Sequence, residues 1–324
     1  MGDKSKIEWT GATWSFVTGC TPVSAGCKNC YSRDMTRRLK AMGQKKYQAG
    51  FDRVVCHPDP DLMFQPMRWK KPRNIFVCSM SDLFHEDVSD AMIMWAWYVM
   101  SQSAQHTFQV LTKRPERMRD WLSKWADTEE PDFDDPVVMA RGPAEIRAKH
   151  KSGRALLFAD MLDLWGDPPD GAAYPLYDWA GGIKWRDTAM INVWLGATVE
   201  NQEMAERRTP VLLECPAEKR FLSCEPLLEE IDLGFGGVMP GRWQWLDSDE
   251  LDWVIVGGES GSKARPMDPM WAKKIIEDCH VNNVPVFMKQ MGAVWAKENC
   301  HTRKGNDPMS WPEWARVQEM PWEG

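Results

Sequence analysis

Three cysteines near the N-terminus have the residue type and spacing of a metal centre. Cys20, Cys27 and Cys30 fall within eleven residues, with six residues between the first two and two between the last two. The stretch also contains Pro22 and Gly26, as expected of a loop. Thiolates in such a loop can converge on one metal site. Three ligands leave one coordination position open, and an open position is what catalysis at a metal requires.

The three thiols are compatible with an iron–sulfur cluster, with a zinc ion, or with buried thiols that bind no metal. A structural zinc ion takes four protein ligands, and the nearest further candidates are Cys56 and His57. A cluster held by three cysteines leaves one iron free, and the amino and carboxylate groups of S-adenosylmethionine can chelate that iron. The chain has nine cysteines, and an odd number with one tight group favours metal binding over disulfides. We therefore predict a cluster.

Composition indicates an ordinary globular enzyme-sized chain with an uneven charge. Of 324 residues, 43% are hydrophobic and 27% charged, and the net charge is −7. Residues 1–75 hold 14 Lys and Arg against 6 Asp and Glu, which makes this part +8. A basic first part can meet phosphates, whereas an acidic whole argues against a general nucleic-acid binder. The nineteen tryptophans are interpreted mainly as packing residues, with a cleft that stacks a base or cofactor as the alternative.

No apolar run reaches the length of a membrane span, and the first ten residues lack the apolar core of a signal peptide. We therefore expect no membrane association. The cysteine usage and the missing signal together predict a cytoplasmic location.

Seven apolar segments alternate for the most part with helical patterns, and this rhythm predicts the fold. Strands that are apolar throughout are buried on both faces, as in a parallel sheet covered by helices. We expect an α/β protein with a partial (β/α) barrel. The expected strands are 12–18, 74–78, 106–111, 192–197, 220–222, 252–256 and 284–288, and the expected helices are 31–42, 91–103, 115–125, 208–213 and 271–282.

The same rhythm predicts the domain organisation. Residues 1–125 and 192–292 are interpreted as one barrel-like catalytic domain. Residues 126–191 are acidic and rich in proline and glycine, and we interpret them as an insertion that serves as a lid or a substrate-selecting subdomain. Residues 293–324 are interpreted as a peripheral C-terminal tail.

Every predicted strand passes into polar or ionisable residues at its carboxyl end. In a βα-barrel these ends converge on one mouth, where the active site lies. Seven such ends favour an enzyme pocket. The residues in question are Cys20, Ser81-Asp82, Lys113-Arg114, Glu200-Asn201, Glu225, Glu259 and Lys289-Gln290.

Several of these residues suit particular tasks. Lys113 and Arg114 oppose the dipole of the helix that follows them, which favours binding of a cofactor carboxylate or a substrate phosphate. The carboxylates after the strands could bind ribose hydroxyls, hold an amino group, or act as acid or base. Among them Glu225 is expected to point inward, and it forms with Lys113 our predicted catalytic pair. The other carboxylates are Asp82, Glu200 and Glu259.

The chain resembles a phage- and prophage-associated family of uncharacterised proteins that is related to the radical S-adenosylmethionine enzymes. The match covers most of the chain outside residues 126–191 and the tail. The segments that carry it are Ile7-Glu8-Trp9-Thr10, Thr13-Trp14, residues 18–31, Ser79-Met80-Ser81-Asp82-Leu83-Phe84-His85, residues 108–115, Val193-Trp194-Leu195-Gly196, residues 221–227, residues 253–261 and Phe287-Met288-Lys289-Gln290.

This resemblance implies a [4Fe–4S] cluster on the three cysteines, S-adenosylmethionine as the second cofactor, and an electron donor such as flavodoxin or ferredoxin. The superfamily's Gly-Gly-Glu element, which holds the methionine amino group, usually follows the second strand. Here Gly257-Gly258-Glu259 follows a late strand, so it is interpreted as a tight turn or as a loop near a ribose or phosphate. Ser79, Ser81 and Asp82 follow the second strand, and they are our candidates for the amino and ribose groups.

We therefore predict a radical S-adenosylmethionine-type enzyme that abstracts hydrogen from an unidentified substrate, with a nucleotide or nucleic acid favoured. If the gene is carried by a phage, the location is the host cytoplasm. The alternative is a zinc-stabilised protein without catalysis that binds nucleic acid or mediates a phage–host interaction.

Overall fold

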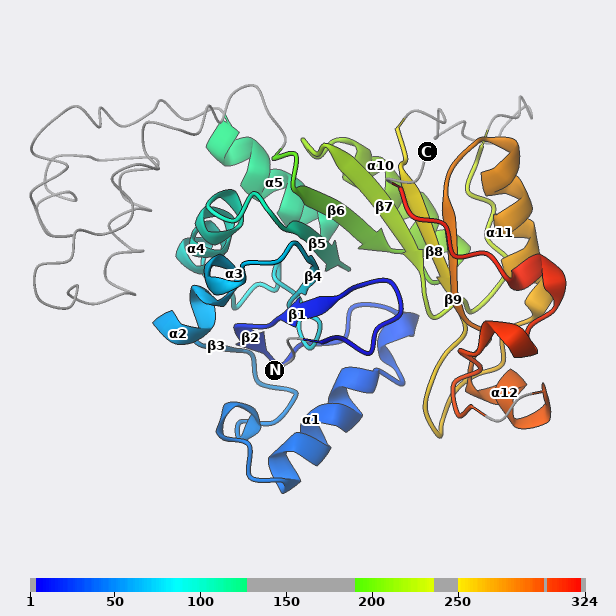
Figure 1. Cartoon of the computed structure of the whole chain (residues 1–324), viewed down its shortest axis with the longest axis horizontal. Coiled ribbons are helices and arrows are strands. Elements are labelled where there is room, and N and C mark those ends of the chain that lie inside the picture. The colour runs from blue at the N-terminus through cyan, green and yellow to red at the C-terminus, as the bar shows by residue number, and fades with distance from the viewer. Residues whose placement is uncertain (1–3, 127–189, 236–249, 300–301, 322–324) are drawn as a thin grey trace, which may run out of the picture.

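The computed structural model describes residues 4–126, 190–235, 250–299 and 302–321. Seven parallel strands form one sheet whose spatial order follows the chain, β1-β4-β5-β6-β7-β8-β9. The sheet curls into an open half-barrel (Figure 1), which confirms the partial (β/α) barrel. The strands are β1 Ala12–Trp14, β4 Asn74–Val77, β5 Thr107–Thr112, β6 Val193–Thr198, β7 Lys219–Cys224, β8 Trp253–Gly257 and β9 Val286–Gln290.

Helices cover the convex face of the sheet and begin where the sequence provides caps (Figure 1). The side chain of Ser89 accepts a hydrogen bond from the Met92 amide at the start of α4, and Pro115 is the first residue of α5. Asn201 caps α10 in the same way, so that helix begins before the predicted residue 208. The main helices are α1 Tyr31–Ala41, α4 Asp90–Ser101, α5 Pro115–Ala126, α10 Gln202–Leu213 and α11 Pro269–Val281, and the shorter ones are α2 Pro60–Met63, α3 Gln65–Arg68 and α12 Ala293–Asn299.

The two faces of the sheet pack into two separate apolar clusters. Strand residues such as Ile75 and Val77 pack with the helices, whereas Phe76 between them points to the concave face. There it joins rings from four other strands and from Trp9, so aromatic packing fills the concave side toward the amino ends of the strands. This cluster consists of Trp9, Phe76, Trp194, Phe221, Trp253, Ile255 and Phe287, and its tryptophans serve as packing residues.

One glycine is required by this aromatic packing. A Cβ on Gly196 would lie 2.5 Å from the ring of Phe221 on the neighbouring strand. Only a residue without a side chain leaves room for that ring on the concave face.

The predicted strand over residues 12–18 is interrupted. β1 ends at Trp14, and residues Val17–Thr18 form a second short strand, β2, that pairs antiparallel with β3, Val55–Cys56. The chain leaves the main sheet at this point, and the cysteines follow β2 rather than β1.

The described part of the C-terminal tail is not peripheral. The amide of Met288 in β9 donates to the carbonyl of Val317, and the amide of Glu319 donates to Val286. Trp311 is fully buried beside them. The tail therefore covers the edge of β9 that would otherwise expose unpaired backbone groups. The predicted insertion, apart from its ends, lies outside the described residues.

Candidate functional site

The cysteine loop, residues 19–30, runs from β2 across the carboxyl ends of the strands to the start of α1 (Figure 1). Its first residue, Gly19, has φ +83° and lies against Arg53, whose carbonyl oxygen would be 2.1 Å from an added Cβ. Only glycine satisfies both conditions. Cys30 directly precedes α1, so the loop and the helix form one continuous segment.

The three thiols of the loop are half-buried and form no disulfide. Burial raises the pKa of Cys20 to about 11, with the Asp82 carboxylate adding to the shift and the Arg114 guanidinium opposing it. Binding a cation would reverse that shift, because a metal stabilises the thiolate. Within the described residues, no three His, Cys, Asp or Glu side chains gather closely enough to hold a single metal ion. The Nε2 of His57 lies 2.8 Å from the hydroxyl of Thr18.

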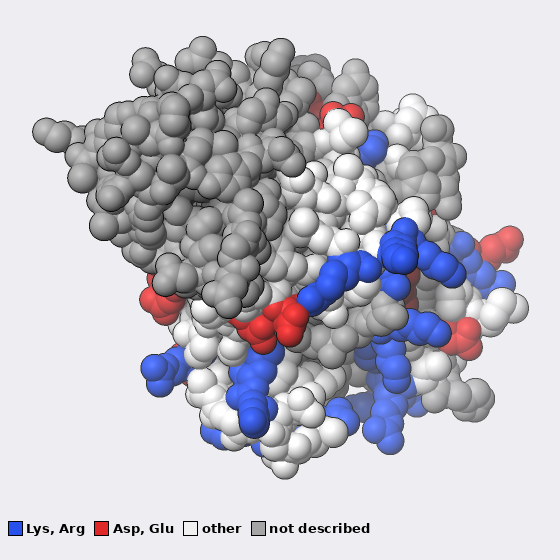
Figure 2. Space-filling view, turned by 60° about the vertical axis from the view of Figure 1, so that its left-hand side comes forward, with Lys and Arg blue, Asp and Glu red and all other residues white. Residues whose placement is uncertain are grey.

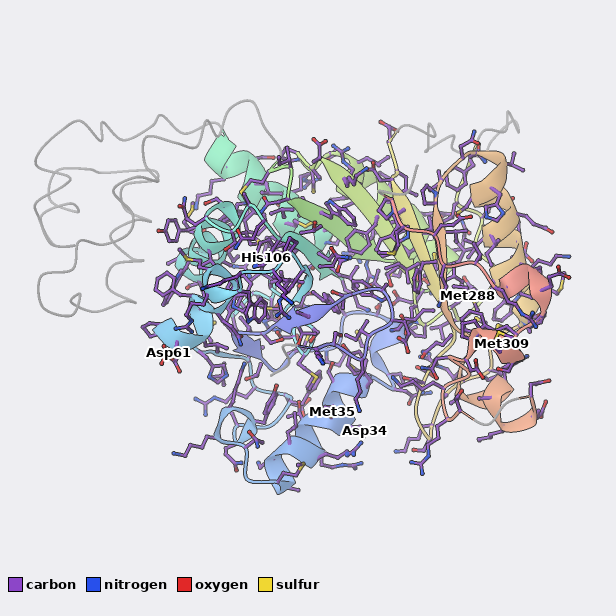
Figure 3. All side chains as sticks on the ribbon, in the orientation of Figure 1. Asp34, Met35, Asp61, His106, Met288 and Met309 are labelled. Atoms are coloured by element: carbon purple, nitrogen blue, oxygen red, sulfur yellow. The ribbon has the colours of Figure 1, made fainter. Side chains whose placement is uncertain are left out.

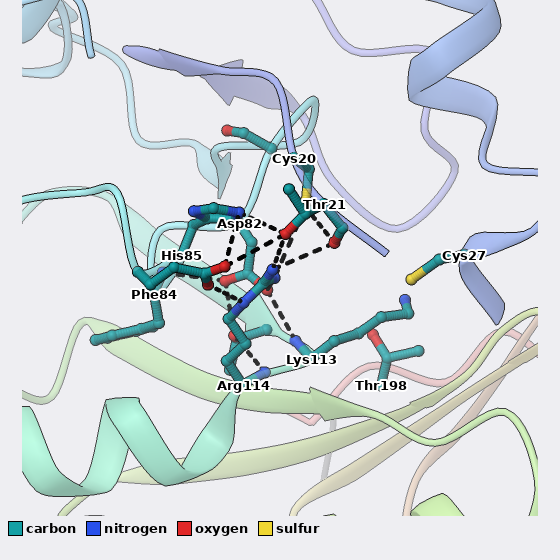
Figure 4. Close-up of polar contacts among 12 residues, drawn as sticks. Cys20, Thr21, Cys27, Asp82, Phe84, His85, Lys113, Arg114 and Thr198 are labelled. Atoms are coloured by element: carbon teal, nitrogen blue, oxygen red, sulfur yellow. Dashed lines mark hydrogen bonds and ion pairs between the residues drawn. The ribbon is translucent and has the colours of Figure 1, made fainter. Parts of the chain in front are cut away.

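The first segment of the loop is held by a buried pair, Asp82 and Arg114. The Arg114 guanidinium lies 3.2 Å from Asp82 Oδ2 and 3.7 Å from Cys20 Sγ, and it donates to the carbonyl of Thr21 at 3.2 Å (Figure 4). Asp82 also accepts a hydrogen bond from the Thr112 hydroxyl at 2.7 Å. Each polar atom here has a partner within the protein, so the pair fixes Cys20 against the ends of β4 and β5.

His85 completes this network as a neutral side chain. Its Nδ1 accepts from the Asp87 amide at 3.1 Å, so Nε2 carries the proton and donates to the Thr21 hydroxyl at 2.7 Å (Figure 4). Burial and the nearby Arg114 cation lower the pKa of His85, against the opposing effect of the surrounding carboxylates. Its role is to orient Thr21.

The middle of the loop is held by a second buried pair, Glu200 and Arg208. Their side chains are 0% and 3% exposed, and Arg208 Nη1 donates to Glu200 Oε2 at 2.9 Å. The other carboxylate oxygen accepts from the Gly26 amide at 3.1 Å. Burial acts to raise the pKa of Glu200, but Lys113, Arg208 and the hydrogen bonds from the loop hold it below its ordinary value. A Cβ on Gly26 would lie 2.9 Å from the Glu200 carboxyl carbon.

A third pair, Glu259 and Arg265, holds the last part of the loop. Arg265 Nη2 donates to Glu259 Oε1 at 2.6 Å, and Nη1 of the same arginine donates to the carbonyl of Ala25 at 3.1 Å. Asn29 donates its side-chain amide to Glu259 Oε2 at 3.0 Å. Three carboxylate–arginine pairs, one after each of β4, β6 and β8, therefore fix the loop; we call them the loop-holding pairs.

Three other charged side chains, Lys113, Glu225 and Lys289, face the concave side of the sheet; we call them the inner charges. Their orientation follows from strand alternation, because they lie two residues beyond Leu111, Ser223 and Phe287 on the same face. The Lys289 ammonium lies 2.7 Å from both oxygens of Glu225. Figure 4 shows the Lys113 side chain extending toward Cys27. In the described part of the chain, Lys113 forms no ion pair.

A family model described as "Protein of unknown function (DUF5131)" matches residues 4–316. The chain belongs to this family. The match includes the cysteine loop, all seven strands and most of the tail, so the half-barrel of this DUF5131 protein is the family's common unit. Searches of curated proteins and of solved structures found no match. The family description states no activity, cofactor or phage origin. Among the described helices, none has the length and apolar character of a membrane span.

The remaining predicted site residues of this DUF5131 protein have identifiable contacts. The Ser81 hydroxyl donates to the Val17 carbonyl at 2.9 Å, and Ser79 lies 3.5 Å from Ser15 through their hydroxyls. Gly257 lies against the Glu225 side chain, and an added Cβ on Gly258 would be 2.6 Å from the Met291 carbonyl, so this glycine lets the segment after β8 approach the segment after β9. A direct role for any of these residues in cofactor binding stays a prediction.

Sequence reasoning missed the partners of the carboxylates. Arg208 and Arg265 hold two of the three pairs, yet neither follows a predicted strand directly. Lys289 was recognised only as a polar strand end, without its contact to Glu225. A buried arginine inside α10 leaves no local signal, because its partner comes from the preceding strand end rather than from the helix.

Proposed function

We propose that this DUF5131 protein is an iron–sulfur enzyme of the radical S-adenosylmethionine type. The observation that carries the proposal is a loop with three half-buried, unpaired thiols, fixed by three ion pairs above the concave face of a half-barrel. Cys20, Cys27 and Cys30 would each bind one iron of a [4Fe–4S] cluster, and S-adenosylmethionine would bind the fourth. When bound, such a cluster supplies the electron that cleaves S-adenosylmethionine, and the resulting 5′-deoxyadenosyl radical abstracts hydrogen from a substrate.

The donor set supports a cluster better than a zinc ion. A structural zinc ion takes four protein ligands, whereas the loop offers three thiols. Cluster ligands bind separate irons and are spread over a larger body. The Arg114 cation beside Cys20 would offset the charge of a thiolate and would act on the cluster's reduction potential through its contact with sulfur.

The inner charges support binding of a polar cofactor and substrate on the concave side. The Lys113 ammonium can hold a carboxylate or phosphate. Glu225 is kept in place by Lys289 and by Gln290, which donates to it at 3.1 Å, so it can hydrogen-bond a hydroxyl or exchange a proton. A nucleotide or nucleic acid is the substrate class that suits these lysines and the basic residues 1–75.

The proposed function also implies a cell compartment and an electron donor. A cluster with an open iron is stable in a reducing cytoplasm, which is the host cytoplasm if the gene is carried by a phage. A one-electron donor such as flavodoxin or ferredoxin is then required.

Anaerobic purification and reconstitution test the proposal. We expect iron and sulfide in equal amounts, a brown protein, and 5′-deoxyadenosine when dithionite and S-adenosylmethionine are added. Cys27→Ala should lose the iron and the product. Cys56→Ala is the matched control, because Cys56 is also half-buried but lies outside the loop, and it should retain both.

A colourless protein that holds one zinc and no iron after reconstitution would contradict the proposal. If zinc binding were then lost in both Cys27→Ala and Cys56→Ala, the zinc-stabilised protein without catalysis would be the better description. Iron and sulfide without 5′-deoxyadenosine would leave a cluster protein that does not cleave S-adenosylmethionine.

A further inference from the structure

Helix α1 presents its apolar side chains to solvent rather than to the core. Tyr31 and Met35 lie four residues apart in the helix, Met42 is its C-cap residue, and the three are 46%, 38% and 71% exposed. The residues that α1 buries are the small polar Ser32 and Thr36. In a helix that packs by its apolar face, the reverse burial is expected. The described part of the chain therefore leaves Met35 and Met42 exposed, whereas Tyr31 reaches Ser79 through its hydroxyl and Leu39 is half-buried.

The contacts at the start of α1 explain this orientation. The hydroxyls of Tyr31 and Ser32 both donate to the carbonyl of Ser79 beyond β4. These contacts turn Ser32 inward and hold Tyr31 by its hydroxyl, while the side chains of Met35 and Met42 stay outside. Figure 3 shows Met35 on α1, well apart from the buried strand residue Met288.

The exposed apolar side chains are concentrated beside the thiols. Eight large hydrophobic residues are exposed in the described chain, and four of them are Val23, Tyr31, Met35 and Met42. The other four are distributed over separate places in the fold. A concentration of this kind marks an interaction site, whereas single exposed apolar residues are normal. We call these four residues and the cations beside them the α1 surface.

The α1 surface is strongly basic. Residues 28–53 contain eight Lys and Arg but only two Asp. Both aspartates are paired within the segment, Asp52 with Arg33 and Asp34 with Arg37. The exposed Arg38 and Lys40 have no ion pair among the described residues. In Figure 2, Lys and Arg side chains are spread over the lower part of the face, the height at which α1 lies in Figure 1.

We propose that the α1 surface is the docking site of an acidic one-electron carrier protein. An apolar centre with a charged rim is the usual composition of a transient protein interface, and flexible methionines suit it. The basic rim selects an acidic partner. A single-stranded nucleic acid would instead favour a row of aromatic rings, and Tyr31 is the one aromatic residue among the four.

The position of the surface suits electron transfer. Cys30 is the residue before Tyr31, and Val23 lies within the cysteine loop, so the N-terminal end of the α1 surface adjoins the thiols and Met42 marks its far end. This inference rests on the proposed function, since it assigns the carrier the task of passing one electron to the cluster. The carrier is oxidised by one electron as the cluster is reduced by one.

Stopped-flow reduction of the reconstituted protein tests the inference, with flavodoxin hydroquinone as the donor. In Arg37→Glu/Arg38→Glu and in Met42→Asp we expect the bleaching of the cluster absorbance to slow at least tenfold. Reduction by dithionite, which needs no docking, should keep its wild-type rate. The wild-type rate with flavodoxin should fall steeply with salt, and the charge-reversed variant should lose this dependence. Lys70→Glu/Lys71→Glu is the matched control with the same charge change outside α1, and it should behave as wild type.

Titration calorimetry with oxidised flavodoxin gives a readout that does not need the cluster. The wild-type protein should bind flavodoxin whether or not iron is present, and the α1 variants should bind at least tenfold more weakly. Equal flavodoxin binding and equal reduction rates in wild type and α1 variants would overturn the docking site. Loss of oligonucleotide binding in those variants with flavodoxin binding unchanged would overturn it in favour of a nucleic-acid surface. A failure of the proposed function is recognised separately, by the absence of iron.

Discussion

The carboxyl edge of the sheet contains two groups of charged residues that have different partners. The carboxylates of the loop-holding pairs are each bound to an arginine; Glu200 and Glu259 also contact the cysteine loop directly, and Asp82 holds it through Arg114. The inner charges face the concave side, where Glu225 and Lys289 contact each other and Lys113 extends toward Cys27. One group fixes the position of the thiols, whereas the other remains available to a ligand.

The two groups differ in how many residues separate each charged side chain from the end of its strand. Lys289 lies within β9, and Lys113 and Glu225 come one residue after β5 and β7. Such positions still follow strand alternation and point into the half-barrel. Glu200 and Glu259 come two residues after their strands, and Asp82 comes five residues after β4. Side chains this far beyond the strand ends no longer point into the half-barrel. They lie near the cysteine loop, which crosses above the sheet.

The largest expected effect comes from breaking the most deeply buried loop-holding pair. Glu200→Ala leaves the buried Arg208 guanidinium without a counter-charge, with the Thr198 carbonyl as a remaining partner. Removing one member of a buried pair costs about 3–5 kcal/mol, so the free energy of unfolding should fall by that amount. Urea unfolding followed by tryptophan fluorescence measures it. Glu203→Ala, at an exposed position in the same helix, is the control and should change little. Equal stability of the two variants would show that Glu200 does not fix the loop.

A steric substitution tests the same contact from the loop side. In Gly26→Ala the new methyl group would lie 2.9 Å from the Glu200 carboxyl carbon, and the loop must shift to relieve the overlap. Overpacking of this kind costs about 1–3 kcal/mol. Gly11→Ala is the matched control, because its nearest neighbour would be 3.5 Å away. Thermal unfolding should separate the two variants, and a loop that tolerates Gly26→Ala without loss would contradict the described packing.

The inner charges should respond in the opposite way. Glu225→Gln keeps the shape and one acceptor oxygen, and Lys289 is 14% exposed and retains access to water. We expect the free energy of unfolding to change by less than about 1 kcal/mol. Production of 5′-deoxyadenosine should fall about 10- to 100-fold if Glu225 hydrogen-bonds a hydroxyl of the bound cofactor. A large loss of stability with unchanged product formation would place Glu225 with the loop-holding pairs instead.

The sequence predicted the sheet because each parallel strand carries a local signal. The segments around Ile75, Val110, Leu195 and Val254 are apolar on both faces, and each is followed by polar residues. The spacing of the three cysteines is likewise contained in one short stretch of sequence. These features need no knowledge of what packs against them, so strand order and the crowding of polar ends at one edge could be inferred.

The contacts between distant segments could not be inferred. Asp82, Glu200 and Glu259 were predicted at the mouth, but nothing local shows that each is bound to an arginine, or that Glu200 and Glu259 contact the loop directly. Helix α1 was predicted correctly as a helix. Its apolar stripe is exposed because two hydroxyl contacts to Ser79, far away in sequence, set its rotation. Tertiary contacts therefore determine both the partners of the carboxylates and the orientation of α1. These contacts join segments far apart in the chain, and the local sequence pattern does not encode them.

The smallest expected effect concerns His85, which is the titratable partner of the loop's first segment. Its pKa is lowered from 6.5 by burial and by Arg114, so the unfolded chain binds a proton at a pH where the folded protein does not. Stability is therefore fully present above pH 6.5 and decreases as the pH falls below it, by at most about 1.4 kcal/mol per pH unit for one group. His85→Gln keeps a donor to Thr21 but does not titrate, so urea unfolding between pH 7.5 and 5 should show a shallower decline than wild type. The comparison cancels the contributions of the other histidines, which both proteins retain, and the lowered pKa values of Glu200 and Glu259 place their own losses below pH 4.5. Parallel stability curves for the two proteins would mean that His85 is not held neutral, and the assignment of its Nε2 proton to Thr21 would then be wrong.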